Sequence, residues 1–345
     1  MNFLPCGAHT VVILAGFSFL VSALPTAAHH SAAIYDMERT VDIVGTVAEY
    51  DWANPHVYID IDVVADSGEV ITWEIEAYPP AVMRRMGWTE TTFRPGDSIR
   101  VSGNPTRSDA RPGIYPQSIE AAGQALFRQA EVGSLFSNPS VVPERGAESL
   151  AGTWETLANM PLIVSFYSPA FELTKAGTAA VDAYDESTML PSLQCIPYSS
   201  PLLMIDPDFK EIELLDSRVI IRGGFAVAER TVHMNTDSHD GVQPSLQGHS
   251  IGHWDGDTLV IDTAAFADHR IGNGYRGVQS GSRKRLLERL SLFDDGKRLR
   301  YAFELHDPDY LEAPVSGEAQ WVFRPGLTYF REDCELDNAR RFTLE

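Results

Sequence analysis

The sequence predicts a mainly β protein with two barrels in series. Short extended runs, separated by Gly, Pro and Asp-Gly, fill most of the chain after residue 39, and we expect a helical turn at 81–86 and a helix at 174–184. The stretch 133–147 is rich in Ser, Asn, Pro, Glu and Gly and lacks periodicity, as linkers do. We therefore expect residues 29–128 and 150–345 to form separate domains, joined by a linker at 129–149.

The chain begins with an apolar run at 11–24, and Thr26-Ala27-Ala28 precedes His29. A run of about 14 apolar residues suits a cleaved signal peptide and is too short to span a bilayer. We expect residues 1–28 to be removed, His29 to become the first mature residue, and the protein to be periplasmic or secreted. The free α-amine and imidazole of His29 form a chelating pair that suits copper.

Acidic residues exceed basic ones by 48 to 27, a formal net charge of −21. This charge disfavours nucleic acid and anionic membrane surfaces as partners, and we expect no stable membrane insertion. Of three cysteines, Cys6 lies in the expected signal peptide. Because the remaining pair is even and the expected compartment is oxidising, we predict one disulfide between Cys195 and Cys334.

The first domain shows extended runs at 40–50, 57–64, 69–76 and 98–103. Some five strands in about 90 residues fit a small OB-like barrel. Alternation in the run 57–64 places Val57, Ile59 and Ile61 on the core face. His56, Tyr58, Asp60 and Asp62 share the other face, which is either an ordinary solvated surface or part of a copper site in which His56 joins His29 and His30.

The second domain begins at Gly152-Thr153-Trp154, and Thr174 is placed to cap a helix at 174–184. The strands after Cys195 are punctuated by Gly, Pro and Asp-Gly, which is typical of an antiparallel meander or closed barrel. The Gly-x-Trp start is similar to that of lipocalins and their calycin relatives. We therefore expect a calycin- or lipocalin-like antiparallel barrel.

The run 249–262 predicts a hairpin, because Asp-Gly between extended runs favours a two-residue type I′ turn. With Asp255-Gly256 as that turn, His249 lies opposite Asp262, and His253 shares their face. A cross-strand His–Asp pair makes His249 a candidate general base oriented by Asp262. The alternative is a polar pair that merely fixes register.

A second Asp-Gly hairpin, with its turn at Asp295-Gly296, places Glu288 among inward apolar residues. A carboxyl in an apolar pocket suits proton transfer near neutral pH, so Glu288 is a candidate acid. The alternative is that a buried arginine neutralises it and its role is structural. Candidate substrate-binding residues are His253, Trp254, Tyr301 and Phe303, which line either an apolar cavity or an ordinary core.

Four further histidines, His233, His239, His269 and His306, have no partner at metal-ligand or triad spacing, which favours surface or core roles. Gly-x-Ser-x-Gly, phosphate-loop and dinucleotide motifs do not occur, so common serine hydrolases, nucleotide enzymes and dehydrogenases are disfavoured. The leading hypothesis is a protein that binds a small, largely apolar molecule in its second barrel and acts on it by cofactor-independent acid–base chemistry, as an isomerase, lyase or cyclase. The alternatives are a periplasmic copper-binding protein and a non-catalytic carrier.

Two stretches resemble uncharacterised families of exported bacterial proteins. Residues 28–127 do so through Ala28-His29-His30-Ser31, Trp52-Ala53-Asn54-Pro55-His56 and Arg84-Arg85-Met86-Gly87-Trp88. Residues 150–338 do so through Cys195-Ile196-Pro197, Gly248-His249-Ser250-Ile251-Gly252 and the run 255–263, but depart from the second family around 198–203 and 209–213. The resemblance implies exported β-domains and names no substrate.

Overall fold

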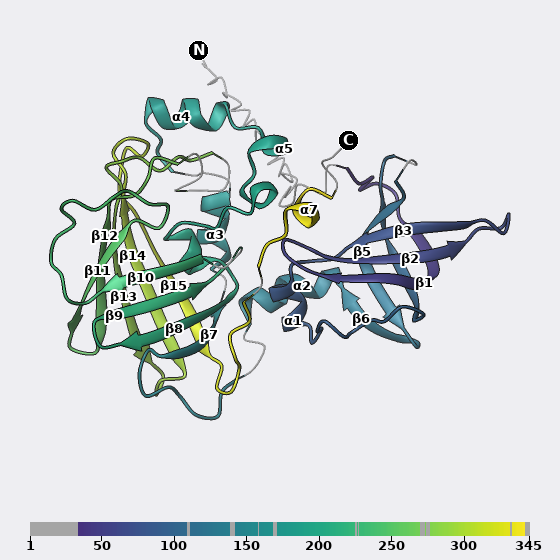
Figure 1. The fold of residues 1–345 in the computed structure, drawn as a ribbon, viewed down its shortest axis with the longest axis horizontal. Coiled ribbons are helices and arrows are strands. Elements are labelled where there is room, and N and C mark those ends of the chain that lie inside the picture. Colours follow the sequence, from purple (N-terminus) through teal and green to yellow (C-terminus); the bar gives the residue numbers. More distant parts are fainter. Residues whose placement is uncertain are drawn as a thin grey trace, which may run out of the picture.

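The computed structural model describes residues 34–341, except 109–110, 139–141, 158, 168–170, 225, 227, 270–272, 274–276 and 332. Two β-barrels lie next to each other (Figure 1), which confirms the predicted mainly β class. The expected signal peptide, His29 and His30 lie outside the described residues. Within the described residues, no helix combines the length and apolarity needed to cross a membrane.

The N-terminal barrel contains five closing strands: β1 (Val41–Trp52), β2 (Val57–Val64), β3 (Val70–Glu76), β4 (Ser98–Pro105) and β5 (Gly113–Ala121). Strand β1 pairs with β2 and β4, and a parallel pairing of β3 with β5 closes the barrel. Helix α1 (Pro80–Arg85) lies between β3 and β4, and β6 (Gln124–Arg128) extends the sheet beyond β5. A five-stranded closed sheet of this order is an OB-like barrel, as predicted.

The apolar alternation of β2 fills this barrel, because Val57, Ile59 and Ile61 are completely buried. Trp88 packs edge-on against Phe93 at 5.0 Å between ring centroids. Part of the expected linker is helical: α2 (Gln129–Ser137) buries Val132 against the same core. The helix is only nine residues long and contains Gly133, so contact with this core rather than local propensity decides its conformation.

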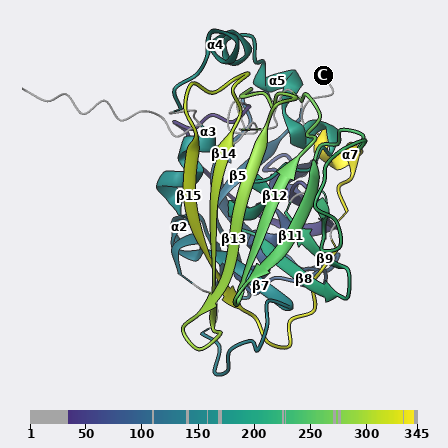
Figure 2. The ribbon, with the colours of Figure 1, turned by 90° about the vertical axis from the view of Figure 1, so that its left-hand side faces the viewer.

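The C-terminal barrel is a closed ring of nine strands, seen from the side in Figure 2. The strands are β7 (Gly152–Leu157), β8 (Phe209–Leu215), β9 (Arg218–Gly223), β10 (Ala228–His233), β11 (His249–Asp255), β12 (Thr258–Ala264), β13 (Arg285–Phe293), β14 (Arg298–His306) and β15 (Val315–Phe323). Eight pairings are antiparallel, as expected for the second barrel. The ninth, β10 with β11, is parallel and involves only two residue pairs, Val232 with Ser250 and His233 with Ile251. We call this weak pairing the seam.

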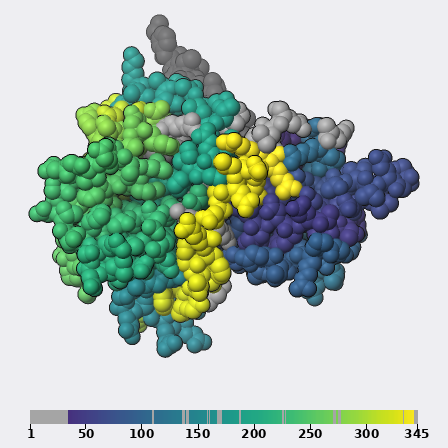
Figure 3. Space-filling model, in the orientation of Figure 1, coloured from purple at the N-terminus to yellow at the C-terminus, as the bar shows by residue number. Residues whose placement is uncertain are grey.

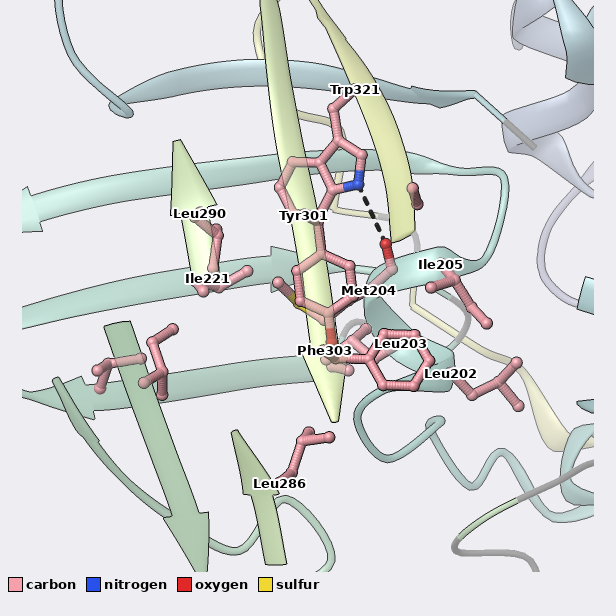
Figure 4. Close-up of a cluster of buried hydrophobic side chains, with 14 of the residues drawn as sticks. Leu202, Leu203, Met204, Ile205, Ile221, Leu286, Leu290, Tyr301, Phe303 and Trp321 are labelled. Atoms are coloured by element: carbon pink, nitrogen blue, oxygen red, sulfur yellow. Dashed lines mark hydrogen bonds between the residues drawn. The ribbon is translucent and has the colours of Figure 1, made fainter. Parts of the chain in front are cut away.

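Short helices connect β7 to β8: α3 (Met160–Tyr167), α4 (Lys175–Asp182), α5 (Glu186–Met189), the 3₁₀ turn η2 (Pro191–Gln194) and α6 (Leu202–Ile205). Thr174 caps α4 as predicted, since its side chain accepts a hydrogen bond from the Gly177 amide at 3.0 Å. Helix α6 is buried in the core of the barrel, where Trp321 Nε1 donates to the Met204 carbonyl at 3.1 Å (Figure 4). Side chains from α6 and the strands therefore pack together in the interior.

The disulfide Cys195–Cys334 is present, with a Cα–Cα distance of 5.6 Å and a sequence separation of 139. It fixes the start of a C-terminal segment, residues 334–341, which contains α7 (Leu336–Ala339). We call this segment the strap. Figure 3 shows the end of the chain, in yellow, lying across the junction between the two barrels.

Candidate active site at the barrel seam

The hairpin that carries His249 has a different register from the predicted one. His249 lies opposite Ala264, and Asp262 lies opposite Ile251, so the predicted direct His249–Asp262 pair is wrong. The turn is Gly256-Asp257 rather than Asp255-Gly256, with Gly256 at φ 60°. Glycine at the first central position is what a type II′ turn requires, and this alternative displaced the expected type I′ turn.

The register shift is two residues, so His249 and Asp262 still share one face of the hairpin. That face is the outside of the barrel, because the alternate residues Ser250, Ile261 and Thr263 are buried in the interior.

The second hairpin has the predicted register, with Glu288 opposite Phe303 and Leu290 opposite Tyr301. Glu288 is fully buried inside the barrel. It lies opposite Ile261 of β12, whose neighbour Asp262 points outward. The sheet therefore separates Glu288 from His249 and Asp262, and the three predicted catalytic residues do not form one site.

Glu288 has a buried partner, Arg230 of β10. Arg230 Nη1 donates to Glu288 Oε1 at 2.8 Å, and Nη2 donates to Oε2. Tyr301 donates its hydroxyl to Glu288 Oε1 at 2.9 Å. Three hydroxyls, those of Ser200, Ser250 and Thr263, take the other Arg230 donors.

The pKa of Arg230 shows that this buried charge is compensated. Burial alone lowers it, but the charge and hydrogen bonds of Glu288 outweigh burial and raise it. The network matches the structural alternative for Glu288, neutralisation by a buried arginine, rather than an acid in an apolar pocket. Tyr301 and Phe303, predicted to bind substrate, are 0% and 5% exposed and belong to the packed core.

On the outer face, a cluster of histidines surrounds His249. His249 Nδ1 lies 2.9 Å from Nδ1 of His239, which comes from the loop between β10 and β11. His239 Nε2 in turn lies 3.7 Å from Asp262 Oδ2, and Asp262 also accepts from Arg285 Nη2 at 2.8 Å. The ring of His233 lies 4.8 Å from that of His249, centroid to centroid. His239 therefore stands between the two residues that were predicted to pair directly.

The environment of His249 favours the neutral form of its ring. Burial lowers its pKa below the usual value of 6.5, and the neighbouring rings of His233 and His239 lower it further. His239 Nε2 makes no hydrogen bond, because Asp262 Oδ2 lies 3.7 Å away, but the nearby negative charge favours a proton on this nitrogen. With that tautomer, His239 Nδ1 accepts from His249 Nδ1, and His249 Nε2 carries a lone pair.

His249 and His233 line a surface cleft of about 380 Å³ at the seam. The cleft exists because β10 and β11 pair only at 232–233 and 250–251, so the residues before each pair diverge. Its walls combine apolar and polar groups: Pro197, Ala228, Glu229, Arg230, Thr231, Ser245, Leu246, Gln247 and Gly248. The volume lies within the range of small-molecule sites.

His253 and Trp254, also predicted to bind substrate, lie beyond this cleft. Both are exposed near the turn of the hairpin, and Trp254 is 46% exposed. The alternation places His253 on the His249 face, but four residues along the strand.

His56, the described member of the predicted copper set, is held by the N-terminal barrel. Its Nδ1 lies 2.9 Å from Glu76 Oε1 and 3.1 Å from the Ala77 carbonyl. Burial lowers the pKa of His56, but the charge and hydrogen bond of Glu76 prevail and raise it. Across the described part of the chain, no group of three or more His, Cys, Asp or Glu side chains is arranged to hold a metal ion.

Sequence reasoning missed His233 and His239 as members of the site. His233 is the last residue of β10. It comes close to β11 through a parallel pairing, which no local signal in the sequence predicts. His239 lies in a loop, where spacing along the chain carries no information about distance in space.

No curated protein matches this chain. A chain of the Stn1-ten1 complex of S. pombe is similar over 25% of this chain and 60% of its own length, with 19% identity and a TM-score of 0.19. The OB-like assignment therefore rests on strand order rather than on this likeness. Residues 18–116 match a family of unknown function (DUF6152), which agrees with the resemblance of the N-terminal stretch to an uncharacterised family.

Proposed function

We propose that this protein is an exported enzyme that acts on a small molecule bound in the seam cleft, with His249 as the general base. The observation that supports this most directly is the chain of contacts from His249 through His239 to Asp262 beside a cleft of suitable size. The disulfide Cys195–Cys334 supports a periplasmic or secreted location, since such bonds persist in oxidising compartments.

The contact chain gives His249 a defined role. Its Nε2 accepts a proton from substrate, and the resulting imidazolium donates through Nδ1 to His239 Nδ1. Asp262 stabilises the positive charge that develops along this chain. Return of the same proton to another substrate atom completes an isomerisation, and loss of a leaving group instead completes an elimination, so neither reaction needs a cofactor.

The cleft restricts the substrate. Pro197, Ala228 and Leu246 offer apolar contact, whereas Glu229 and Gln247 offer polar groups. A site of this size and lining suits a small, largely apolar molecule with one polar function that orients it. A carbonyl is such a function, and it also acidifies the neighbouring C–H bond that a histidine base would deprotonate.

The experiment uses a panel of small enolisable carbonyl compounds in D₂O. We expect the protein to catalyse deuterium incorporation into at least one of them, detected by mass spectrometry. His249→Ala should abolish this exchange, and the matched control His253→Ala, on the same strand and face but outside the cleft, should retain it. If exchange persists in a folded His249→Ala variant, the proposal is wrong.

His239→Ala and Asp262→Asn test the relay separately. Each should lower the exchange rate by about tenfold to a hundredfold, because a positioned acid–base group contributes about 10²–10⁴-fold and these residues act through His249. The pH dependence should also shift in both variants. A panel member that is retained by the protein without exchange would favour the non-catalytic carrier instead.

A second candidate function, copper binding in the periplasm, is favoured by the setting of His56. Metal-binding histidines commonly donate their other ring nitrogen to a carboxylate or backbone carbonyl, and His56 Nδ1 meets both Glu76 and Ala77. Its Nε2 would then join His29 and His30. Native mass spectrometry of the mature protein should detect one copper ion, which an added residue before His29 removes; an unchanged copper content would exclude this site.

A further inference from the structure

The strap connects the two domains through several independent contacts. The disulfide fixes Cys334 to the C-terminal domain, and Arg340 Nε donates to the Leu193 carbonyl at 2.9 Å. On the N-terminal side, Glu335 donates its amide to the Asn54 carbonyl at 3.1 Å. Asn338 reaches the His56 carbonyl and Asp51 Oδ2, both at 3.1 Å.

Arg341, at the end of the strap, occupies a cage of carboxylates on the OB-like barrel. Its Nε donates to Glu74 Oε2 at 2.6 Å, and its Nη2 donates to both Asp60 oxygens at 2.8 and 2.9 Å. Asp51 lies 3.4 Å from Nη1. The guanidinium carbon lies 4.6 Å from the ring centroid of Tyr58, which covers one face of the group.

This arrangement matches the shape of a guanidinium group. Two carboxylates meet the planar edge of the group and an aromatic ring meets its face, which is how proteins select arginine over lysine. The cage is partly withdrawn from water, with Arg341 and Asp60 side chains each 18% exposed and Glu74 11% exposed. Burial raises the pKa of Asp60, and Arg341 opposes this shift, so the Asp60 carboxylate is costly to leave without a cation. Glu74 has a second cationic partner, because Arg111 Nη2 donates to its Oε2 at 3.1 Å.

The cage also lies on a surface that OB folds use for ligands. Strands β2 and β3 supply Tyr58, Asp60 and Glu74, and the face of these strands is the common binding face of the fold. The strap lies against this face through its hydrogen bonds to the His56 carbonyl, Asp60 and Glu74. From the sequence, this face was either a solvated surface or part of a copper site. In the structure, the chain's own C-terminal segment contacts it.

We propose that this face is a binding site for the arginine side chain of a polypeptide partner, and that Arg341 of the strap occupies it in the closed state. The bound guanidinium of Arg341 is the evidence that the cage accepts this group. The net charge of −21 attracts cationic partners. Because Arg341 is attached to the same chain, its effective concentration is in the millimolar range, and a partner gains access when the strap is displaced.

The experiment replaces the occupant and supplies a matching ligand. Arg341→Ala should bind N-acetyl-arginine amide at least about tenfold more tightly than the unaltered protein does, as measured by isothermal titration. Arg340→Ala is the matched control, because the neighbouring guanidinium binds the C-terminal domain rather than the cage. N-acetyl-citrulline amide, which has the same shape without the charge, should not bind.

Two further variants separate the cage from other acidic surface. Arg341→Ala combined with Asp60→Asn and Glu74→Gln should lose the gained affinity. Equal affinity of the unaltered protein, Arg341→Ala and this triple variant would refute the proposal.

A second measurement does not depend on the stability of these variants. In the unaltered protein, reduction of Cys195–Cys334 frees the other end of the strap and should strengthen binding of the same ligand. A folded, reduced protein with unchanged affinity would also refute the proposal. Neither experiment involves His249 or the seam cleft, so its result is independent of the proposed enzymatic function.

Discussion

Replacement of Glu288 by glutamine tests the structural role of the buried Arg230–Glu288 pair. Glutamine has nearly the same volume but no charge, and one end of its side chain places an N–H donor where Glu288 accepts from Arg230. Arg230 and Glu288 side chains are 1% and 0% exposed, so water cannot replace the lost partner.

The expected loss can be estimated from this geometry. Removal of one partner of a buried ion pair costs about 3–5 kcal/mol, because the other charge stays buried and uncompensated. For a domain of this size, each kcal/mol lowers the melting temperature by about 2–4 °C, which gives a fall of about 10 °C. Scanning calorimetry and urea unfolding followed by circular dichroism would measure both quantities.

Glu304→Gln on the adjacent strand is the matched control. Glu304 faces outward and is 49% exposed, so its replacement should change stability by less than about 0.5 kcal/mol. Arg230→Met combined with Glu288→Leu should be less destabilised than Glu288→Gln, since it leaves no buried charge. An ordinary point mutation changes the free energy of unfolding by about 1 kcal/mol. If Glu288→Gln lowers the free energy of unfolding by no more than this, the argument for a structural pair fails.

Three further predictions concern the stability of the fold. Burial lowers the pKa of His56, but Glu76 outweighs burial and raises it in the folded protein. The His56–Glu76 pair therefore stabilises the fold fully below the unfolded pKa of about 6.5, and this stabilisation is lost as pH rises through the folded pKa. Glu76→Gln should lower the melting temperature more at about pH 5.5 than at about pH 8.5, measured at the same ionic strength. Burial lowers the pKa of Lys284 to about 7 in the folded protein, so above that pH unfolding takes up one proton. The free energy of unfolding should therefore rise between about pH 7 and 10, with a slope approaching 1.4 kcal/mol per pH unit. Lys284→Met should remove this rise, as measured by urea titrations. Replacement of Cys195 and Cys334 by serine should cost about 5 kcal/mol relative to the oxidised protein, in the loop-entropy account for a separation of 139 residues. Reduction of the unaltered protein should cause the same loss, which urea unfolding with and without reductant would measure.

Local pattern predicted much of the fold because the relevant signals act over a few residues. Alternating apolar residues gave strand β2 its bounds and its buried face, and Thr174 capped α4 where expected. The hairpin around Asp295-Gly296 had the predicted register, which placed Glu288 inside the barrel. Side chains in a strand alternate between the two faces with a period of two residues. A register shift of two therefore leaves His249 and Asp262 on the same face.

The sequence by itself predicted four strands of the first barrel, the two Asp-Gly hairpins of the second, the apolar face of β2, and a disulfide between Cys195 and Cys334. Only the tertiary structure decided what meets across long separations: Arg230 with Glu288, His239 with His249, and Arg341 with Asp60. The physical reason is that propensity, turn chemistry and alternation are local, whereas these contacts depend on barrel closure at a parallel seam and on a strap tied back to the first domain. The candidate site lies at the seam, and local sequence patterns do not predict which residues meet there.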